Sequence, residues 1–182
     1  MQPASSNILD DLGNPIVFQL VSAARSTMNE WDRLRQFIRF EHRVGDVWFA
    51  RCNPRASVVP LLMPWFVARF NTQRFVIYDE THHLSGVWDG KKTHLVQTDE
   101  VDAPPLTIEE PQMQQAWIAY WNHITISERY NPELQRQNMP KRLWRNITEV
   151  KAQPEWKPDA VNSVHPSHHR QAPVPLSHRM AG

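Results

Sequence analysis

A basic and aromatic segment near the C-terminus carries the residues best suited to bind a charged ligand. Between positions 129 and 145, five cations are interrupted by a single acid, Glu133. Cations neutralise phosphates and aromatic faces stack on bases, so the mixture predicts a nucleic-acid surface. The alternative is a solvated helix face whose charge is balanced by the acidic segment at 99–110. The predicted contact residues are Arg129, Tyr130, Arg136, Lys141, Arg142, Trp144 and Arg145.

Acids and histidines around a predicted hairpin are the other candidates for chemistry. Asp79 and Asp89 end predicted strands, where acids often act in catalysis, although turns also favour Asp. His82, His83 and His94 could approach one another across the hairpin. Adjacent strand residues point to opposite faces and the spacing fits no zinc pattern, so we expect no metal site. Catalytic residues are not identified, and whether the chain is an enzyme stays open.

Four short β-prone runs must position these side chains. They occupy positions 47–52, 75–79, 84–88 and 93–96. Asp89–Gly90 separates the last two runs and is a strong hairpin signal. The runs predict a small antiparallel sheet of three to four strands. Helical patterns on both sides of these runs in the chain would cover the sheet, so the predicted fold class is α+β.

Helical periodicity accounts for the rest of the folded part. Apolar spacing predicts one helix that starts near Pro15 and a second from about 29 to 40. Ser57 can cap a helix that extends through Phe70. From 111 to 126, apolar side chains recur at helical spacing, and we interpret this stripe as core. The stripe consists of Met113, Trp117, Tyr120 or Trp121, and Ile124.

Length and composition predict how the chain is organised. A chain of 182 residues suits one domain with a real core. We expect a loose N-terminus at 1–13, a single α+β domain at 14–151 and a disordered tail at 152–182. The tail is rich in proline and histidine and poor in apolar residues. It therefore cannot bury enough surface to offset the entropy lost on ordering.

Composition also excludes several classes of protein. Cys52 is the only cysteine, so an internal disulfide and a Cys-based zinc site are excluded, and a reducing cytoplasm is expected. The thiol follows an alternating apolar run, which predicts a buried, inert group. Glycine is scarce and neither phosphate-binding fingerprint occurs, so no cofactor is expected. Without a signal pattern or a run long enough to span a membrane, the chain is expected to be soluble.

Three segments together resemble one known family. They read FIRFEHRVGDVWFARCNPRASVVPLLMPWFVARF, FVIYDETHHLSGVWDG and YWNHITISERYNPELQRQNMPKRLWRNITEV. The order and spacing of the blocks at Arg69–Phe70, Asn131–Pro132 and 139–144 are specific. From roughly Phe18 to Val150, the chain resembles an uncharacterised bacterial domain family of probable DNA metabolism proteins. Members of that family are paired with a radical-SAM protein thought to act in DNA repair or modification. Many members are fused ahead of a uracil-DNA glycosylase domain.

This resemblance implies an accessory or adaptor protein in DNA repair or modification, with DNA and the radical-SAM protein as partners. The chain departs from the family at two points. Its length leaves no room for a glycosylase domain, and Trp65 stands where members are expected to carry His before Phe66. Both departures argue against a self-sufficient enzyme. Two alternatives stay open: a module that docks the radical-SAM partner without touching nucleic acid, and a small enzyme of unknown reaction.

Overall fold

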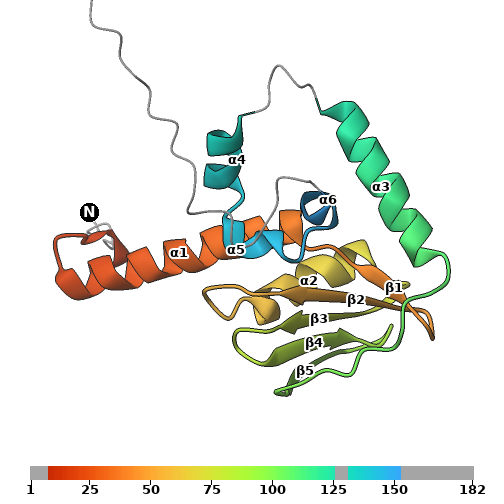
Figure 1. Cartoon of the computed structure of the whole chain (residues 1–182). Coiled ribbons are helices and arrows are strands. Elements are labelled where there is room, and N and C mark those ends of the chain that lie inside the picture. Colours follow the sequence, from red (N-terminus) through yellow and green to blue (C-terminus); the bar gives the residue numbers. More distant parts are fainter. Residues whose placement is uncertain (1–7, 126–130, 153–182) are drawn as a thin grey trace, which may run out of the picture.

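A five-stranded mixed sheet forms the centre of the structure (Figure 1). The computed structural model describes residues 8–125 and 131–152. The strands lie side by side in chain order. They are β1 (Glu41–Arg43), β2 (Val47–Cys52), β3 (Arg74–Asp79), β4 (Leu84–Trp88) and β5 (Thr93–Gln97). The α+β class is confirmed, with more strands than predicted, because β1 is a short polar segment that has no alternating apolar pattern.

The pairing of β2 with β3 differs from the prediction. These strands are parallel, with Trp48 opposite Phe75, whereas the other pairs are antiparallel. Parallel neighbours need a long crossover connection, and α2 (Val59–Arg69) supplies it. The expectation of an entirely antiparallel sheet is therefore wrong. The strand runs were recognisable one at a time, but their direction depends on the helix between them.

The crossover helix α2 packs closely on β4 because Gly86 lacks a side chain. A Cβ atom at Gly86 would lie 2.5 Å from the Met63 sulfur and 2.8 Å from a methyl carbon of Val59. Val59, Leu62, Met63 and Phe66 of α2 are all buried. The main core thus lies between α2 and one face of the sheet.

Helix α1 (Pro15–Phe37) is continuous where two helices were predicted. The side chain of Asn14 accepts a hydrogen bond from the Ile16 N–H and caps its start, and no Pro or Gly follows within it. Its C-terminal half packs on the core through buried Leu34, and the Trp31 indole donates to the Leu61 carbonyl oxygen at 3.0 Å. Its N-terminal half extends away from the sheet (Figure 1).

Helix α3 (Glu110–Ile124) stands beside the sheet and points away from it (Figure 1). Its apolar stripe is not core: Met113 is 60% exposed, Trp117 39%, Tyr120 55% and Ile124 52%. Among the residues of α3, only Glu110 is buried. The prediction that this stripe is core is wrong, because helical spacing shows which residues share a face but not what that face contacts.

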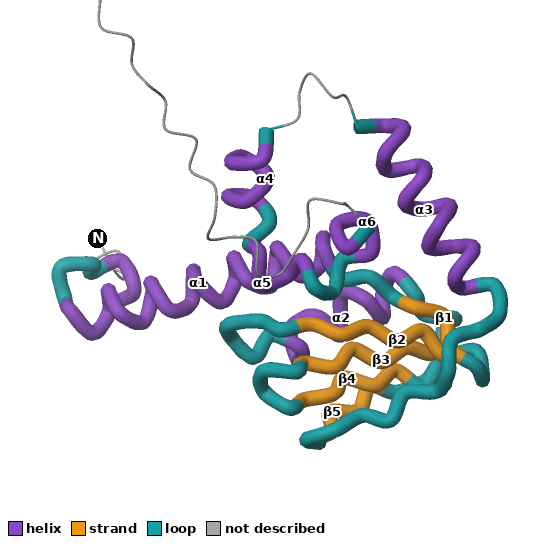
Figure 2. Tube along the Cα trace, in the orientation of Figure 1, coloured by secondary structure: helices purple, strands orange, loops and turns teal. Residues whose placement is uncertain are grey.

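The C-terminal helices return the chain to α1. They are α4 (Pro132–Asn138), α5 (Lys141–Trp144) and α6 (Thr148–Lys151). Leu143, Ile147 and Val150 are buried in the same core cluster as Leu34 and Cys52. Figure 2 shows the long loop between β5 and α3, which passes back to β1, where the Val44 N–H donates to the Pro105 carbonyl oxygen.

The ends of the chain bear on two further predictions. Ile8–Asp10 forms a short 3-10 helix inside the segment predicted to be loose. The predicted disordered tail lies outside the described residues from position 153 onward. Within the described ranges, no helix combines the length and the apolar character that crossing a bilayer requires.

Candidate functional site

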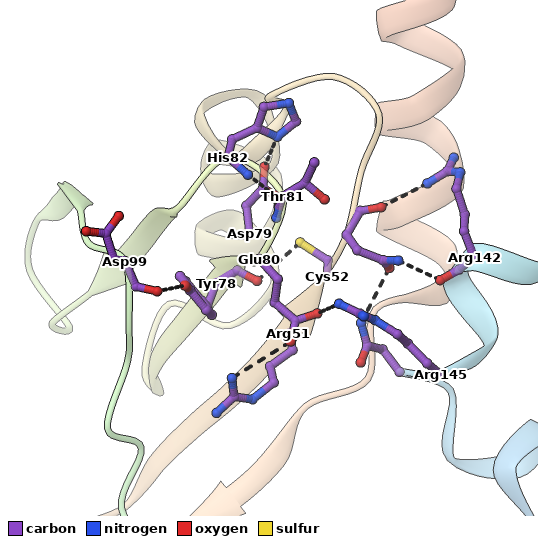
Figure 3. A network of polar contacts seen from close by, with 12 residues as sticks. Arg51, Cys52, Tyr78, Asp79, Glu80, Thr81, His82, Asp99, Arg142 and Arg145 are labelled. Atoms are coloured by element: carbon purple, nitrogen blue, oxygen red, sulfur yellow. Dashed lines mark hydrogen bonds and ion pairs between the residues drawn. The ribbon is translucent and has the colours of Figure 1, made fainter. Parts of the chain in front are cut away.

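Helix α5, the part of the basic segment that contains Arg142, lies at the carboxyl ends of the parallel strands β2 and β3 (Figure 3). The Arg142 guanidinium contacts the Glu30 carboxylate at 2.5 Å and donates to the Asn53 carbonyl oxygen at 3.2 Å. The Asn53 amide in turn donates to the Arg142 carbonyl oxygen at 2.7 Å. Glu30 is buried and also accepts a hydrogen bond from the Arg55 N–H. Arg142 therefore joins α5, α1 and the loop after β2.

Arg145 occupies a more open position at the same edge. Its guanidinium pairs with the Glu80 carboxylate, and that carboxylate also lies 3.9 Å from Arg51. The Arg145 side chain is still 54% exposed. Arg51 and Arg145 thus share one carboxylate, that of Glu80, at this edge of the sheet.

The other predicted contact residues have different surroundings. The Trp144 indole donates to the Met139 carbonyl oxygen at 2.8 Å, and its ring packs against the core. Lys141 is half-buried and has no charged partner among the described residues. Arg136 belongs to α4, but its side chain, like Arg129 and Tyr130, lies outside the described part. Lys141, Arg142, Trp144 and Arg145 thus share the short segment at α5, but their side chains have different surroundings.

The acidic segment at 99–110 does not supply the partners of these cations. The Tyr78 hydroxyl donates to the Asp99 carbonyl oxygen, and the buried Glu110 carboxylate accepts from the His42 N–H at 2.9 Å. Both contacts lie away from α5. The acids that pair with Arg142 and Arg145 are Glu30 and Glu80, and sequence reasoning did not single out either, because both are far from these arginines along the chain.

Asp79 and His82 form a second polar pair at this edge of the sheet (Figure 3). The fully buried Asp79 carboxylate lies 2.7 Å from His82 Nδ1 and accepts hydrogen bonds from the Thr81 and His82 N–H groups. A carboxylate that fixes an imidazole can support proton transfer. The two backbone bonds also make Asp79 a turn-forming residue, so the pair alone does not define a reaction.

The remaining histidines lie apart from this pair. His83 has a left-handed backbone, with φ of 54°. His94 lies at the other end of the β4–β5 hairpin and contacts Asp89. Hydrogen bonds from the Lys92 N–H, the His94 ring and the Lys91 N–H lower the pKa of Asp89 to about 2. In the described part of the chain, no three His, Cys, Asp or Glu side chains gather as a metal site.

Cys52, the last residue of β2, is buried, as the sequence predicted. Burial raises the pKa of its thiol well above its usual range, and the nearby carboxylates of Asp79, Glu80 and Glu30 raise it further. The thiol donates a weak hydrogen bond to the Tyr78 carbonyl oxygen at 3.6 Å. A thiol held in its protonated form is a poor nucleophile.

A third polar cluster was missed by sequence reasoning. Buried Glu149 of α6 pairs with Arg39 at 2.5 Å and accepts a hydrogen bond from the Trp117 indole at 2.9 Å. Burial alone would raise the pKa of Glu149. Hydrogen bonds from Arg39, from its own backbone and from Trp117 outweigh burial, so its pKa is lowered. No local signal marks this cluster, since its members come from distant parts of the chain.

The architecture defines an α+β domain in which a mixed sheet carries one crossover helix and a basic C-terminal segment. The chain belongs to the family described as a domain of unknown function, DUF4130, whose sequence profile matches residues 2–149. This match confirms membership of an uncharacterised domain family. No curated protein and no solved structure gives a significant match.

Proposed function

We propose that this chain is an accessory protein in DNA repair or modification that acts by docking a partner protein on α3. One observation carries the proposal. Met113, Trp117, Tyr120 and Ile124 are spaced by four, three and four residues, and all four are exposed. This spacing places them on one face of the helix.

The composition of this α3 face fits protein recognition. Helices that lie in a groove use apolar anchors at such spacings, and Trp and Tyr are the residue types most enriched among interface hot spots. The Trp117 ring is already oriented, because its indole N–H bonds to Glu149 and the Arg39 guanidinium lies 5.6 Å from the ring centroid. A pre-oriented aromatic side chain loses less conformational entropy on binding.

The partner we propose is the radical-SAM protein that the sequence resemblance implies. The face would fit an apolar groove on that protein, with Tyr120 and Ile124 as anchors toward the C-terminal end of α3. In this role the chain brings the partner to its substrate or stabilises it, and catalysis belongs to the partner. The Asp79–His82 pair would then only stabilise the turn after β3.

Co-purification of the two proteins at high salt tests this proposal. We expect Tyr120→Glu with Ile124→Glu to abolish the complex, because charged side chains cannot enter an apolar groove. Gln115→Glu with Asn122→Glu is the matched control, since both residues are exposed on other faces of α3. Unchanged binding by the first pair would reject the proposal. A dimer of the isolated chain that the same pair disrupts would reject it too, since a second copy would then cover the face.

The cations around Glu80 favour a second candidate function, direct contact with DNA. Arg51 and Arg145 share one carboxylate, and half-buried Lys141, which has no charged partner among the described residues, lies on the same segment as Arg145. Exposed cations attract phosphates and release counterions when they bind. Arg142 would support this surface by holding α5 in place, as its guanidinium is occupied by Glu30.

A DNA titration at several salt concentrations tests this second candidate. Lys141→Glu with Arg145→Glu is expected to weaken binding and to flatten the log–log salt dependence by about one unit for each cation that no longer neutralises a phosphate. The fold is expected to survive, because exposed ion pairs contribute roughly 0–1 kcal/mol. An unchanged slope would show that these cations only face solvent.

A further inference from the structure

An aromatic hollow opens where α1 and α2 end and the parallel strands begin. It is lined by Phe40, Trp48, Phe70, Gln73 and Phe75, and its volume is about 170 Å³. An apolar cavity of roughly 150 Å³ can admit a benzene ring. The hollow is therefore large enough for one flat aromatic ring. It is lined by neither α3 nor the basic segment.

The walls of the hollow are held by neighbouring rings. Phe40 meets Phe70 and Phe75 edge-on, with centroid distances of 5.9 and 5.7 Å. Trp48 is the register partner of Phe75 on the adjacent strand, and the His42 ring stacks on Trp48 at 4.7 Å. These contacts form the hollow without a ligand, so a ring that enters it meets prearranged aromatic surfaces. Every base has a π-face, so aromatic walls of this kind can stack on any of the four.

A single amide supplies the polar group of the hollow. Gln73 is exposed, and its side chain has no hydrogen-bond partner within the described residues. A primary amide offers both a donor and an acceptor. It can therefore form hydrogen bonds with the edge of a nitrogen heterocycle, whereas a plain hydrocarbon ring has no donor or acceptor for it.

A cationic groove adjoins the hollow and shares Phe40 and Phe70 with it. This second space has a volume of about 300 Å³ and includes Arg35, Trp65 and Arg69 among its walls. The Arg69 guanidinium lies 5.6 Å from the Trp65 ring centroid and has no acidic partner in the described part of the chain. Arg35 is paired with Asp32 at 2.5 Å. Arg69 is thus the cation free to bind an anion, and its planar guanidinium suits phosphate.

We infer that the hollow and the groove together bind one unpaired nucleotide. The base enters the hollow among Phe40, Trp48, Phe70 and Phe75, the Gln73 amide meets its edge, and Arg69 binds its phosphate. The nucleotide can be free in solution or can belong to a single strand or to a base turned out of a duplex. This site goes beyond the α3 docking face and does not depend on it.

An NMR titration with nucleoside 5′-monophosphates and with a short single-stranded oligonucleotide tests the inference. We expect the Gln73 side-chain amide and the Trp48 indole N–H signals to move on binding. Arg69→Ala should weaken binding by about tenfold and flatten the salt dependence by about one unit. Gln73→Ala should change the order of preference among the four bases but leave the salt dependence unchanged. Both residues are exposed, so the variants should fold.

Arg25→Ala is the matched control, because Arg25 is an exposed arginine of α1 outside the hollow and the groove. Equal affinity for monophosphates and oligonucleotide would identify a free nucleotide as the ligand, whereas binding of the oligonucleotide alone would identify a strand. Both results support the site. No shift at Gln73 and Trp48 with either probe at low salt, or equal losses from Arg69→Ala and Arg25→Ala, would overturn it. The Tyr120→Glu and Ile124→Glu pair should bind nucleotides normally, which separates this site from the docking face.

Discussion

Arg142 and Arg145 lie three residues apart in one basic segment, yet their surroundings are opposite. Arg142 is paired with buried Glu30, whereas Arg145 is half-exposed beside Glu80. The sequence predicted both as nucleic-acid contacts, because cation density in a segment is visible but an acid 112 positions away is not. Position in the fold, rather than residue type, decides which of these cations faces solvent.

Replacing the two arginines separately should reveal this difference. Arg142→Ala leaves the Glu30 carboxylate buried without its partner, and loss of one member of a buried pair typically destabilises by about 3–5 kcal/mol. Arg145→Ala should change the free energy of unfolding by no more than about 1 kcal/mol, because Glu80 also lies near Arg51 and the pair is exposed. Urea denaturation of both variants measures the effects. Losses of equal size would show that the two pairs are equivalent.

At the scale of elements, local signals predicted four strands within about one residue of their observed bounds. The strands at 47–52 and 84–88 match the prediction, and those at 74–79 and 93–97 differ by one residue at one end. Alternation, β-branched residues and the Asp89–Gly90 turn are all local, so they were visible in the sequence. The parallel direction of β2 and β3 and the exposure of the α3 face depend on tertiary contacts, so they were not.

The contact between α2 and β4 gives a prediction at this scale. Gly86→Ala would place a methyl group 2.5 Å from the Met63 sulfur and 2.8 Å from Val59, so one element must shift. Met63 can rotate, but the branched Val59 side chain cannot easily move away. Overpacking of this kind costs about 1–3 kcal/mol, which thermal or urea unfolding would detect.

Gly13→Ala serves as the control for this substitution. A Cβ atom there meets only an Asp11 carboxylate oxygen, at 3.4 Å, and Gly13 is exposed before α1. The stability of the Gly13→Ala variant should stay close to that of the wild type. If Gly86→Ala were equally neutral, α2 would not pack on β4 as closely as the structure has it.

On the scale of the whole molecule, Glu149 links three distant parts of the chain. It binds Arg39 just beyond α1 and Trp117 on α3, and its own helix α6 buries Val150 in the core. Along the chain, Arg39 precedes the strands, whereas Trp117 and Glu149 follow them. The charge of Glu149 should therefore affect the stability of the entire fold. The predicted contact residues of the basic segment gave no sign of this cluster, because none of them belongs to it.

The pH dependence of unfolding should therefore carry a contribution from Glu149. Burial acts to raise its pKa, but hydrogen bonds from Arg39, its own backbone and Trp117 outweigh burial, so the pKa in the folded protein lies below the ordinary value of 4.5. The folded state consequently prefers the carboxylate more strongly than the unfolded state does. The stabilisation is fully present above the unfolded pKa and is lost as the pH falls through the folded pKa.

Comparison of the wild type with Glu149→Gln isolates this contribution. The amide can still meet Trp117 but cannot form the ion pair with Arg39, so the variant should be less stable near neutral pH. As the pH falls below 4.5 and then through the lower pKa of the folded state, the wild-type carboxylate becomes protonated and the difference in unfolding free energy should shrink. Glu100→Gln is the control, since Glu100 is exposed and its side chain has no ion pair among the described residues. A stability difference that stayed constant from neutral pH into this acid range would show that the charge of Glu149 does not hold these elements together.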